Sequence, residues 1–495
     1  MERCRGGGGD PVRRWLALLL APATVAAAEP PVVAVTGGQV RGSAAADRLI
    51  FRGIRYAAPP LGERRWREPA AVERWRGVAD AARAAPACLQ NDYGWNRASH
   101  VFASEDCLTI DVATPALTGK RPVFVWIHGG SNRAGAGGMT ETPMVTKDIV
   151  VVSVQYRLGI FGFLAHRGAV EDGHAGNYGL MDQIAGLRWV QANIARFGGD
   201  PARVTIAGES AGAQDVGLLI ASPAARGLFA QAVMQSGTPN FGLPPRPLDE
   251  ALWLGDQVDA ALGTDGSIAA LRRASANALL AADLKLHDAR LTADDYLWLR
   301  TTIDGTVIPS DPAALMAKAP PRPAIVGSNR FELDLPGGRA ARDAFVALSF
   351  GANEGAARHF YGLGGRDPAA DPRMGSIDQQ IATDATFRCP AGRMAMAIAA
   401  TGAPVWRYDF DLSGDGGRTA HAVDIGYFWG SARAAKLSLL DYWANFARTG
   451  NPNGAGLPGW PRFDAGTQRH IVFGNGGVGT GARLREPVCA LTEAL

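Results

Sequence analysis

The 495-residue sequence lacks several features that would define the class of the protein at once. It contains no Asn-x-Ser/Thr sequon, so N-glycosylation is not expected. It has no basic stripe with interleaved aromatic residues, and its formal net charge is only +3, which argues against nucleic acid as a partner. It has no close Cys-x-x-Cys pair, which argues against a zinc site. No metal or organic cofactor is therefore expected.

The overall composition is that of an ordinary globular protein, with 47% hydrophobic and 20% charged residues. Internal repeats are absent. The length alone would allow two or three domains, but α/β enzymes of this size often form one unit. We expect residues 29–495 to form a single domain.

The N-terminal segment has the pattern of a secretory signal peptide. Arg13 and Arg14 end a basic region, residues 15–25 are apolar, and residues 26–28 offer an Ala-x-Ala cleavage site. A transmembrane anchor is the alternative, but this apolar run is shorter than the ~20 residues needed to span a bilayer. The arginine pair also suits a twin-arginine signal, although the rest of that pattern is poor. Residues 1–28 therefore predict a secreted or periplasmic protein.

Five cysteines are present: Cys4, Cys88, Cys107, Cys389 and Cys489. Removal of the signal peptide takes Cys4 and leaves an even number, which suits two disulfides in an exported protein. Four cysteines allow three pairings, of which Cys88 with Cys107 is the local one. Four buried free thiols are the alternative.

Short apolar runs alternate with helical patterns along most of the chain. Residues 180–197 have helical spacing and stop at two glycines, as helices often do. Continuous apolar strands that alternate with helices predict a mostly parallel sheet covered on both faces. The helical block at 250–300 is expected to cap this sheet, and the glycine-rich segment 474–481 to form a surface loop. The strand candidates are 32–35, 49–52, 123–127, 149–154, 204–207, 230–235, 324–326 and 405–410.

The most informative stretch is the pentapeptide Gly208-Glu209-Ser210-Ala211-Gly212. It follows a β-rich run and opens a helix-compatible run, which is the context of a nucleophile elbow. A serine hydroxyl needs a histidine to take its proton, an acid to orient that histidine, and donors for the oxyanion. In this chain order the acid and the histidine follow the serine. The histidines that qualify are His287, His359, His421 and His470, and spacing alone does not choose among them.

Several blocks in the right order resemble the type-B carboxylesterase family, which includes cholinesterases and many bacterial esterases. The resemblance extends from about residue 33 to the end of the chain. It implies an α/β-hydrolase fold, with a mostly parallel central sheet, helices on both faces and helical cap insertions. The blocks that carry it are residues 104–109, 126–130, 176–183, 197–212 and 450–453.

The same resemblance assigns the catalytic residues. Glu332 ends a G-x-N-x-x-E block and corresponds to the acid, whereas His421 corresponds to the base of Ser210. The oxyanion hole falls on Gly130, Ser131 and Ala211. Ser131 stands where the family usually has a third glycine, but its backbone N–H is still available.

Supporting roles also follow from the resemblance. Glu209 corresponds to an acid that supports the histidine indirectly, together with the serine at Ser236. The disulfide pairs implied are Cys88 with Cys107 and Cys389 with Cys489.

Together these features predict a secreted serine carboxylesterase that takes a small-molecule ester, most simply a small aliphatic or aryl ester. A lipase acting on long-chain esters is the first alternative. A non-catalytic adhesion or binding module of the same fold is the second, although such proteins typically lack a triad member. The rate should rise through a pH near ~6.5, as His421 loses its proton in the free enzyme. Nothing in the sequence indicates the oligomeric state.

Overall fold

The computed structural model describes residues 30–173, 176–239, 244–288, 300–414, 416–429 and 439–492. The predicted signal peptide, residues 1–28, and Cys4 lie outside the described residues, as does part of the predicted helical block, residues 289–299.

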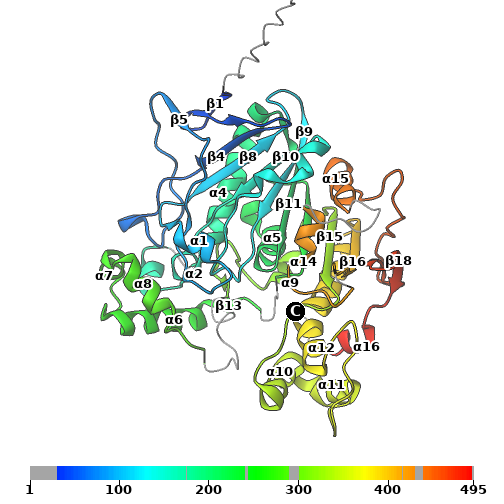
Figure 1. Cartoon of the computed structure of the whole chain (residues 1–495). Coiled ribbons are helices and arrows are strands. Elements are labelled where there is room, and N and C mark those ends of the chain that lie inside the picture. The colour runs from blue at the N-terminus through cyan, green and yellow to red at the C-terminus, as the bar shows by residue number, and fades with distance from the viewer. Residues whose placement is uncertain are drawn as a thin grey trace, which may run out of the picture.

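An 11-stranded sheet forms the centre of the described fold (Figure 1). Its strands from β10 to β17 are parallel, and the strands at both edges run antiparallel to their neighbours. This arrangement confirms the predicted fold class. In spatial order the strands are β18 (Gly477–Ala482), β17 (Arg469–Gly474), β16 (Val405–Asp411), β15 (Ala324–Asn329), β12 (Gln231–Gln235), β11 (Gly199–Glu209), β9 (Arg121–Ile127), β10 (Val150–Val154), β8 (Thr109–Thr114), β4 (Leu49–Arg55) and β3 (Ser43–Ala44).

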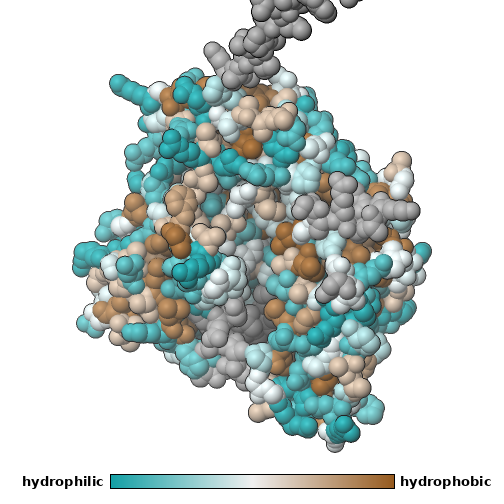
Figure 2. All heavy atoms as spheres, viewed as in Figure 1, coloured by the Kyte–Doolittle hydropathy of each residue, from teal (hydrophilic) through white to brown (hydrophobic). Residues whose placement is uncertain are grey.

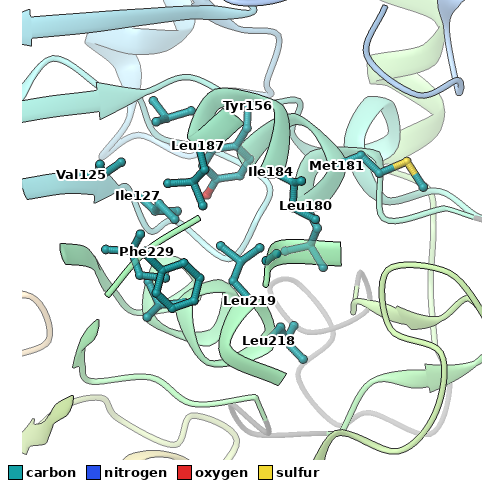
Figure 3. Packing of buried hydrophobic residues seen from close by; sticks show 14 of the residues in the cluster. Val125, Ile127, Tyr156, Leu180, Met181, Ile184, Leu187, Leu218, Leu219 and Phe229 are labelled. Atoms are coloured by element: carbon teal, nitrogen blue, oxygen red, sulfur yellow. The ribbon is translucent and has the colours of Figure 1, made fainter. Parts of the chain in front are cut away.

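The central strands are buried on both faces, which explains their continuous apolar sequence. On one face, Val125 and Ile127 of β9 pack in a cluster with Leu187 of α4 (Tyr178–Asn193) and Leu219 of α5 (Ala211–Ala221) (Figure 3). α13 (Cys389–Ala400) also joins this cluster. The alternate residues of the same strands belong to a second cluster with α14 (Val423–Phe428) and α15 (Leu440–Thr449). Helices therefore cover both faces of the sheet.

Two groups of helices lie at the same end of the molecule (Figure 1). The first contains α6 (Leu248–Leu262), α7 (Ile268–Arg273) and α8 (Ala276–Asp283), within the predicted helical block. The second contains α10 (Gly338–Phe350), α11 (Glu354–Tyr361) and α12 (Ile377–Thr383). The other named helices and strands are β1 (Val32–Val35), β2 (Gly38–Arg41), β5 (Val78–Asp80), β6 (Ala87–Cys88), α1 (Arg97–Val101), β7 (Ala103–Ser104), α2 (Gly159–Phe163), α3 (Arg167–Glu171), β13 (Arg246–Pro247), β14 (Thr302–Ile303), α9 (Pro312–Met316) and α16 (Glu486–Cys489).

The prediction of a surface loop at residues 474–481 is wrong. This segment closes a hairpin in which β18 pairs antiparallel with β17 along six residue pairs. Gly477 has a φ of +117°, a conformation that glycine adopts without steric cost, at the turn of this hairpin. Glycine disfavours strands in general, but the backbone hydrogen bonds of an edge strand need no side chain, so pairing with β17 prevails.

Two disulfides link the described cysteines. Cys88 is bonded to Cys107, 19 positions away, and Cys389 is bonded to Cys489, 100 positions away. Within the described ranges, no helix is long and apolar enough to cross a membrane.

Candidate active site

Ser210 lies on a sharp turn between strand β11 and helix α5, where its backbone has φ +57° and ψ −126°. Such a conformation is strained for a residue with a side chain, and it persists only where the surroundings fix it. Two neighbouring glycines allow the tight turn. A Cβ on Gly208 would lie 2.4 Å from the backbone of Gly212, and one on Gly212 would lie 2.2 Å from the carbonyl oxygen of Ile127. The predicted strand–turn–helix context of Ser210 is therefore present.

Glu332 and His421 reach the same region from two other strands. Glu332 follows β15 and His421 lies between β16 and α14. Since β11, β15 and β16 run parallel, their carboxyl ends share one edge of the sheet, where α/β proteins usually bind ligands. The topology therefore brings residues distant in the sequence to one place.

The side chains of these residues form one continuous hydrogen-bonded chain. Nε2 of His421 lies 2.9 Å from Oγ of Ser210, and Nδ1 of His421 lies 2.8 Å from Oε2 of Glu332. The backbone N–H of His421 also donates to the carbonyl oxygen of Glu332 at 3.0 Å. The imidazole is therefore held at both ring nitrogens.

The carboxylate of Glu332 is itself fixed by the protein. Its Oε1 accepts from the backbone N–H of Asn329 at 2.7 Å, and its Oε2 accepts from the side-chain amide of Asn329 at 3.3 Å. The backbone N–H of Glu332 donates to Oγ1 of Thr383 at 3.2 Å. Glu332 is 2% exposed, so the solvated surface position that a glutamate usually takes does not apply here.

Glu209 faces the histidine directly. Its Oε1 lies 3.3 Å from Nε2 of His421, and burial raises the pKa of Glu209 to about 8. Ser236, expected to act with Glu209, is also buried, but its hydroxyl makes no hydrogen bond within the part of the chain that the structure describes. Burial lowers the pKa of His421, but the carboxylates of Glu209 and Glu332 outweigh this effect and raise that pKa to about 9.

The loop that contains Gly130, Ser131 and Asn132, called the oxyanion loop here, follows β9 and turns back beside Ser210. Gly130, Ser131 and Asn132 have φ values of +107°, +57° and +56° in succession. In the described ranges, the N–H groups of Gly130 and Ser131 donate no hydrogen bond to a backbone carbonyl. These N–H groups are therefore available to a ligand.

The sequence-based prediction missed Asp424, which belongs to the same buried region. It lies three residues after His421, and its Oδ2 accepts from Nε2 of Gln235 and from the hydroxyl of Tyr408, both at 2.9 Å. Its position near the start of α14, one turn from His421, was the available signal. The other candidate histidines lie in different places: His470 in β17, His359 in α11 and His287 after α8.

The loop closed by Cys88 and Cys107 carries exposed apolar side chains. Trp95, Val101 and Phe102 are 56%, 74% and 56% exposed. The ring of Trp95 lies against Gly130, since a Cβ built there would be 3.0 Å from it. The face seen in Figure 2 mixes polar and hydrophobic residues, with hydrophobic groups on both sides of its middle. This loop therefore contacts the oxyanion loop.

No group of three or more potential metal ligands occurs among the described residues. A serine, a histidine and a carboxylate joined in one hydrogen-bonded chain are an arrangement that is chemically capable of acyl transfer.

The sheet, its helices and the turn at Ser210 define an α/β-hydrolase. The chain belongs to the Carboxylesterase family, whose pattern matches residues 29–344 and 355–491, and it is a carboxylic-ester hydrolase.

Individual relatives agree with this membership. The chain is 34% identical to the "Fatty acyl-CoA hydrolase precursor, medium chain" of Anas platyrhynchos, over 89% of this chain and 88% of the relative. It is 33% identical to "Liver carboxylesterase 1" of Mus musculus, over 88% of each chain. Among solved structures, it resembles a "PNB esterase" with a TM-score of 0.81 and 29% identity, over 93% of this chain and 99% of the other.

Proposed function

We propose that the protein is an exported serine carboxylesterase in which Ser210, His421 and Glu332 form the catalytic triad. The single observation that carries this proposal is the hydrogen-bonded chain from Oγ of Ser210 through both ring nitrogens of His421 to Glu332.

In the first half of the reaction, Oγ of Ser210 attacks the ester carbonyl carbon while Nε2 of His421 takes the hydroxyl proton. Glu332 holds the imidazole in the tautomer that leaves Nε2 free and stabilises the imidazolium. The tetrahedral intermediate then collapses. The bond to the alcohol oxygen breaks, the alcohol leaves with the proton from His421, and an acyl group stays on Ser210.

In the second half, water takes the place of the alcohol. His421 removes a proton from the water molecule as the water oxygen attacks the acyl carbon. The proton then passes from His421 to Oγ of Ser210 as the carboxylic acid product leaves. In both halves the carbonyl oxygen becomes negative. The N–H groups of Gly130, Ser131 and Ala211 are assigned to stabilise that charge, and preorganised donors of this kind typically contribute about 10²–10³-fold in rate.

Glu209 is assigned an electrostatic role. Its carboxylate lies within 3.3 Å of Nε2 of His421, so it favours the imidazolium that forms in each step. Ser236 is assigned to the same buried region, without a direct hydrogen bond to Glu209 in the described residues.

A fluorophosphonate probe tests this proposal directly, because it reacts covalently with an activated serine. We expect labelling at Ser210, located by peptide mass spectrometry, and loss of labelling in Ser210→Ala. Ser222→Ala is a matched control, since Ser222 is buried at the other end of α5. Failure of the folded wild-type protein to label would favour a non-catalytic binding module instead.

Export rests on the sequence pattern of residues 1–28 and on two further observations. The described cysteines form two disulfides, which persist in oxidising compartments. One relative is itself named a precursor. We expect the mature protein from the native host to begin at Glu29. N-terminal sequencing that finds residues 1–28 retained would contradict this assignment.

A second candidate function is hydrolysis of long-chain esters at an interface. The exposed Val101 and Phe102 favour it, because they add apolar surface to the loop whose Trp95 lies against Gly130. If it holds, replacing both with serine should reduce activity on emulsified p-nitrophenyl palmitate more than on dissolved p-nitrophenyl butyrate. Leu348→Ser, at a 51% exposed residue of α10, is the matched control. Equal effects on both esters would favour the hydrolysis of small, dissolved esters instead.

A further inference from the structure

At two positions of the oxyanion loop, residues with a side chain take a backbone conformation that glycine adopts more easily. Ser131 and Asn132 both have φ near +57°, the left-handed region that residues with a side chain rarely adopt. Serine has no special preference for this region, whereas asparagine tolerates it better than most. Two such residues in a row persist only when the surrounding structure fixes them. The contacts of this loop therefore decide whether its N–H groups point at the substrate.

Asn132 supplies three of these contacts. Its carbonyl oxygen accepts from the backbone N–H of Gly159 at 2.7 Å, and its Oδ1 accepts from the hydroxyl of Tyr156 at 3.2 Å. Its Nδ2 donates to Oδ1 of Asp215 at 3.1 Å. Asn132 is only 3% exposed, so water does not replace these bonds easily.

Asp215 connects this loop to the helix of the nucleophile. It belongs to α5, which begins directly after Ser210, and it is fully buried. Its second oxygen accepts from Nε2 of Gln183 in α4 at 2.6 Å. A buried carboxylate with two amide donors and no cationic partner among its hydrogen bonds is uncommon, because burying a charge is costly. The reaction described above makes no use of Asp215.

We propose that Asp215 is a positioning residue of the oxyanion hole, which fixes the turn at Ser131 and Asn132 relative to Ser210. This inference rests on the proposed function, because it concerns the same catalytic site. Asp215 touches no reacting atom. It acts through Asn132, whose amide it holds, and through α5, whose first N–H is that of Ala211. One side chain thereby sets the distance between the two halves of the oxyanion hole.

The neutral variant Asp215→Asn should preserve this geometry. Its side-chain oxygen can accept from Asn132, and its amide can donate to Oε1 of Gln183 after a flip of that amide. Oε1 of Gln183 has no hydrogen-bond partner among the described residues, so the flip breaks no bond at that oxygen. Burial already raises the pKa of Asp215 to about 7, which agrees with a site that accepts a neutral side chain. Asp215→Ala, in contrast, leaves the amide of Asn132 without its acceptor.

The experiment compares wild type, Asp215→Ala, Asp215→Asn and Asn132→Ala, with active sites counted by a fluorophosphonate probe. Hydrolysis of p-nitrophenyl butyrate gives kcat and KM per titrated site. Inhibition by an n-octyl trifluoromethyl ketone reports on the oxyanion hole itself. The adduct that this ketone forms with Ser210 places a negatively charged oxygen in the oxyanion hole. Asp111→Ala is the control, since Asp111 is a buried carboxylate of β8 that accepts from the backbone of Gly53.

For Asp215→Ala we expect kcat per site to fall about 10–100-fold, with KM changed less than about threefold and ketone inhibition weakened in parallel. Asp215→Asn and Asp111→Ala should stay within about threefold of wild type. Should Asp215→Ala not fold, Asn132→Ala breaks the same contact and should show the same pattern.

Wild-type kcat in titrated sites of both Asp215→Ala and Asn132→Ala would overturn the inference, as would a loss of kcat without any change in ketone inhibition. If wild type itself is not labelled at Ser210, the proposed function fails instead, so the two failures are distinguishable.

Discussion

Nε2 of His421 lies 2.9 Å from Oγ of Ser210, although 211 positions separate the two residues in the chain. The contact depends on strand order, since β11 and β16 are separated in the sheet only by β12 and β15 and all four run parallel. Their carboxyl ends therefore meet at one edge. The second nitrogen of His421 contacts Glu332, so the sheet places a serine hydroxyl, an imidazole and a carboxylate in line.

The carboxylates around His421 predict an unusual pH profile. The neutral imidazole is the active base, so kcat/KM rises as pH increases through the pKa of His421. Since the neighbouring carboxylates raise that pKa to about 9, the midpoint should lie above the ~6.5 of an ordinary histidine. Glu209→Gln removes one of these charges and should move the midpoint to lower pH.

The measurement is kcat/KM for p-nitrophenyl butyrate between pH 5 and 10, corrected for spontaneous hydrolysis. Glu141→Gln, at a side chain that is 80% exposed, is the control and should leave the midpoint unchanged. A midpoint that stays fixed in Glu209→Gln would show that Glu209 does not act on His421.

The glycines of the elbow predict a steric effect. Gly212→Ala would place a Cβ 2.2 Å from the carbonyl oxygen of Ile127 and 2.7 Å from that of His128, so the backbone must shift. Both carbonyls belong to the segment that leads into the oxyanion loop. We expect kcat to fall by about 10²-fold, because a displacement of about 1 Å at a catalytic site has effects of that size.

Gly355→Ala is the matched control for this steric effect, since Gly355 lies in helix α11 with open space around it. That change should preserve activity and stabilise the helix by up to about 1 kcal/mol, measured by thermal unfolding. Full activity in Gly212→Ala would mean that the turn tolerates a side chain.

The two disulfides predict unequal effects on stability. In the chain-entropy account, a cross-link stabilises by restricting the unfolded chain, and more so for a longer loop. Removing Cys389–Cys489, which spans 100 positions, should therefore lower the free energy of unfolding by about 1.5 kcal/mol more than removing Cys88–Cys107, which spans 19. Double Cys→Ser variants compared by denaturant unfolding measure the difference. A larger loss from the shorter loop would show that native contacts outweigh chain entropy.

Local sequence patterns predicted most of the central sheet. The apolar runs at 123–127 and 149–154 correspond to β9 and β10, and the helical spacing from Leu180 corresponds to α4. These segments are buried on both sides, so their composition alone reveals them. The strand at 477–482 was not predicted, because its glycines carry no apolar pattern and its pairing depends on β17.

The residues of the candidate site also differ in whether the local sequence predicts them. The elbow at Ser210 is encoded locally, by the pentapeptide 208–212 with the β-rich run before it and the helical run after it. His421 and Glu332 needed the family resemblance, since nothing local indicates that they meet. The bond between Asn132 and Asp215 could not be predicted from either residue. It depends on how the loop after β9 lies on α5, which is a property of the packed fold.

Acylation of Oγ of Ser210 is tested best by measuring the hydrolysis of p-nitrophenyl butyrate by the Ser210→Ala variant. If Ser210 is the nucleophile, kcat should fall by roughly 10⁴-fold or more, because triad members act as a unit. A correctly folded Ser210→Ala variant that keeps a tenth of the wild-type rate would contradict it.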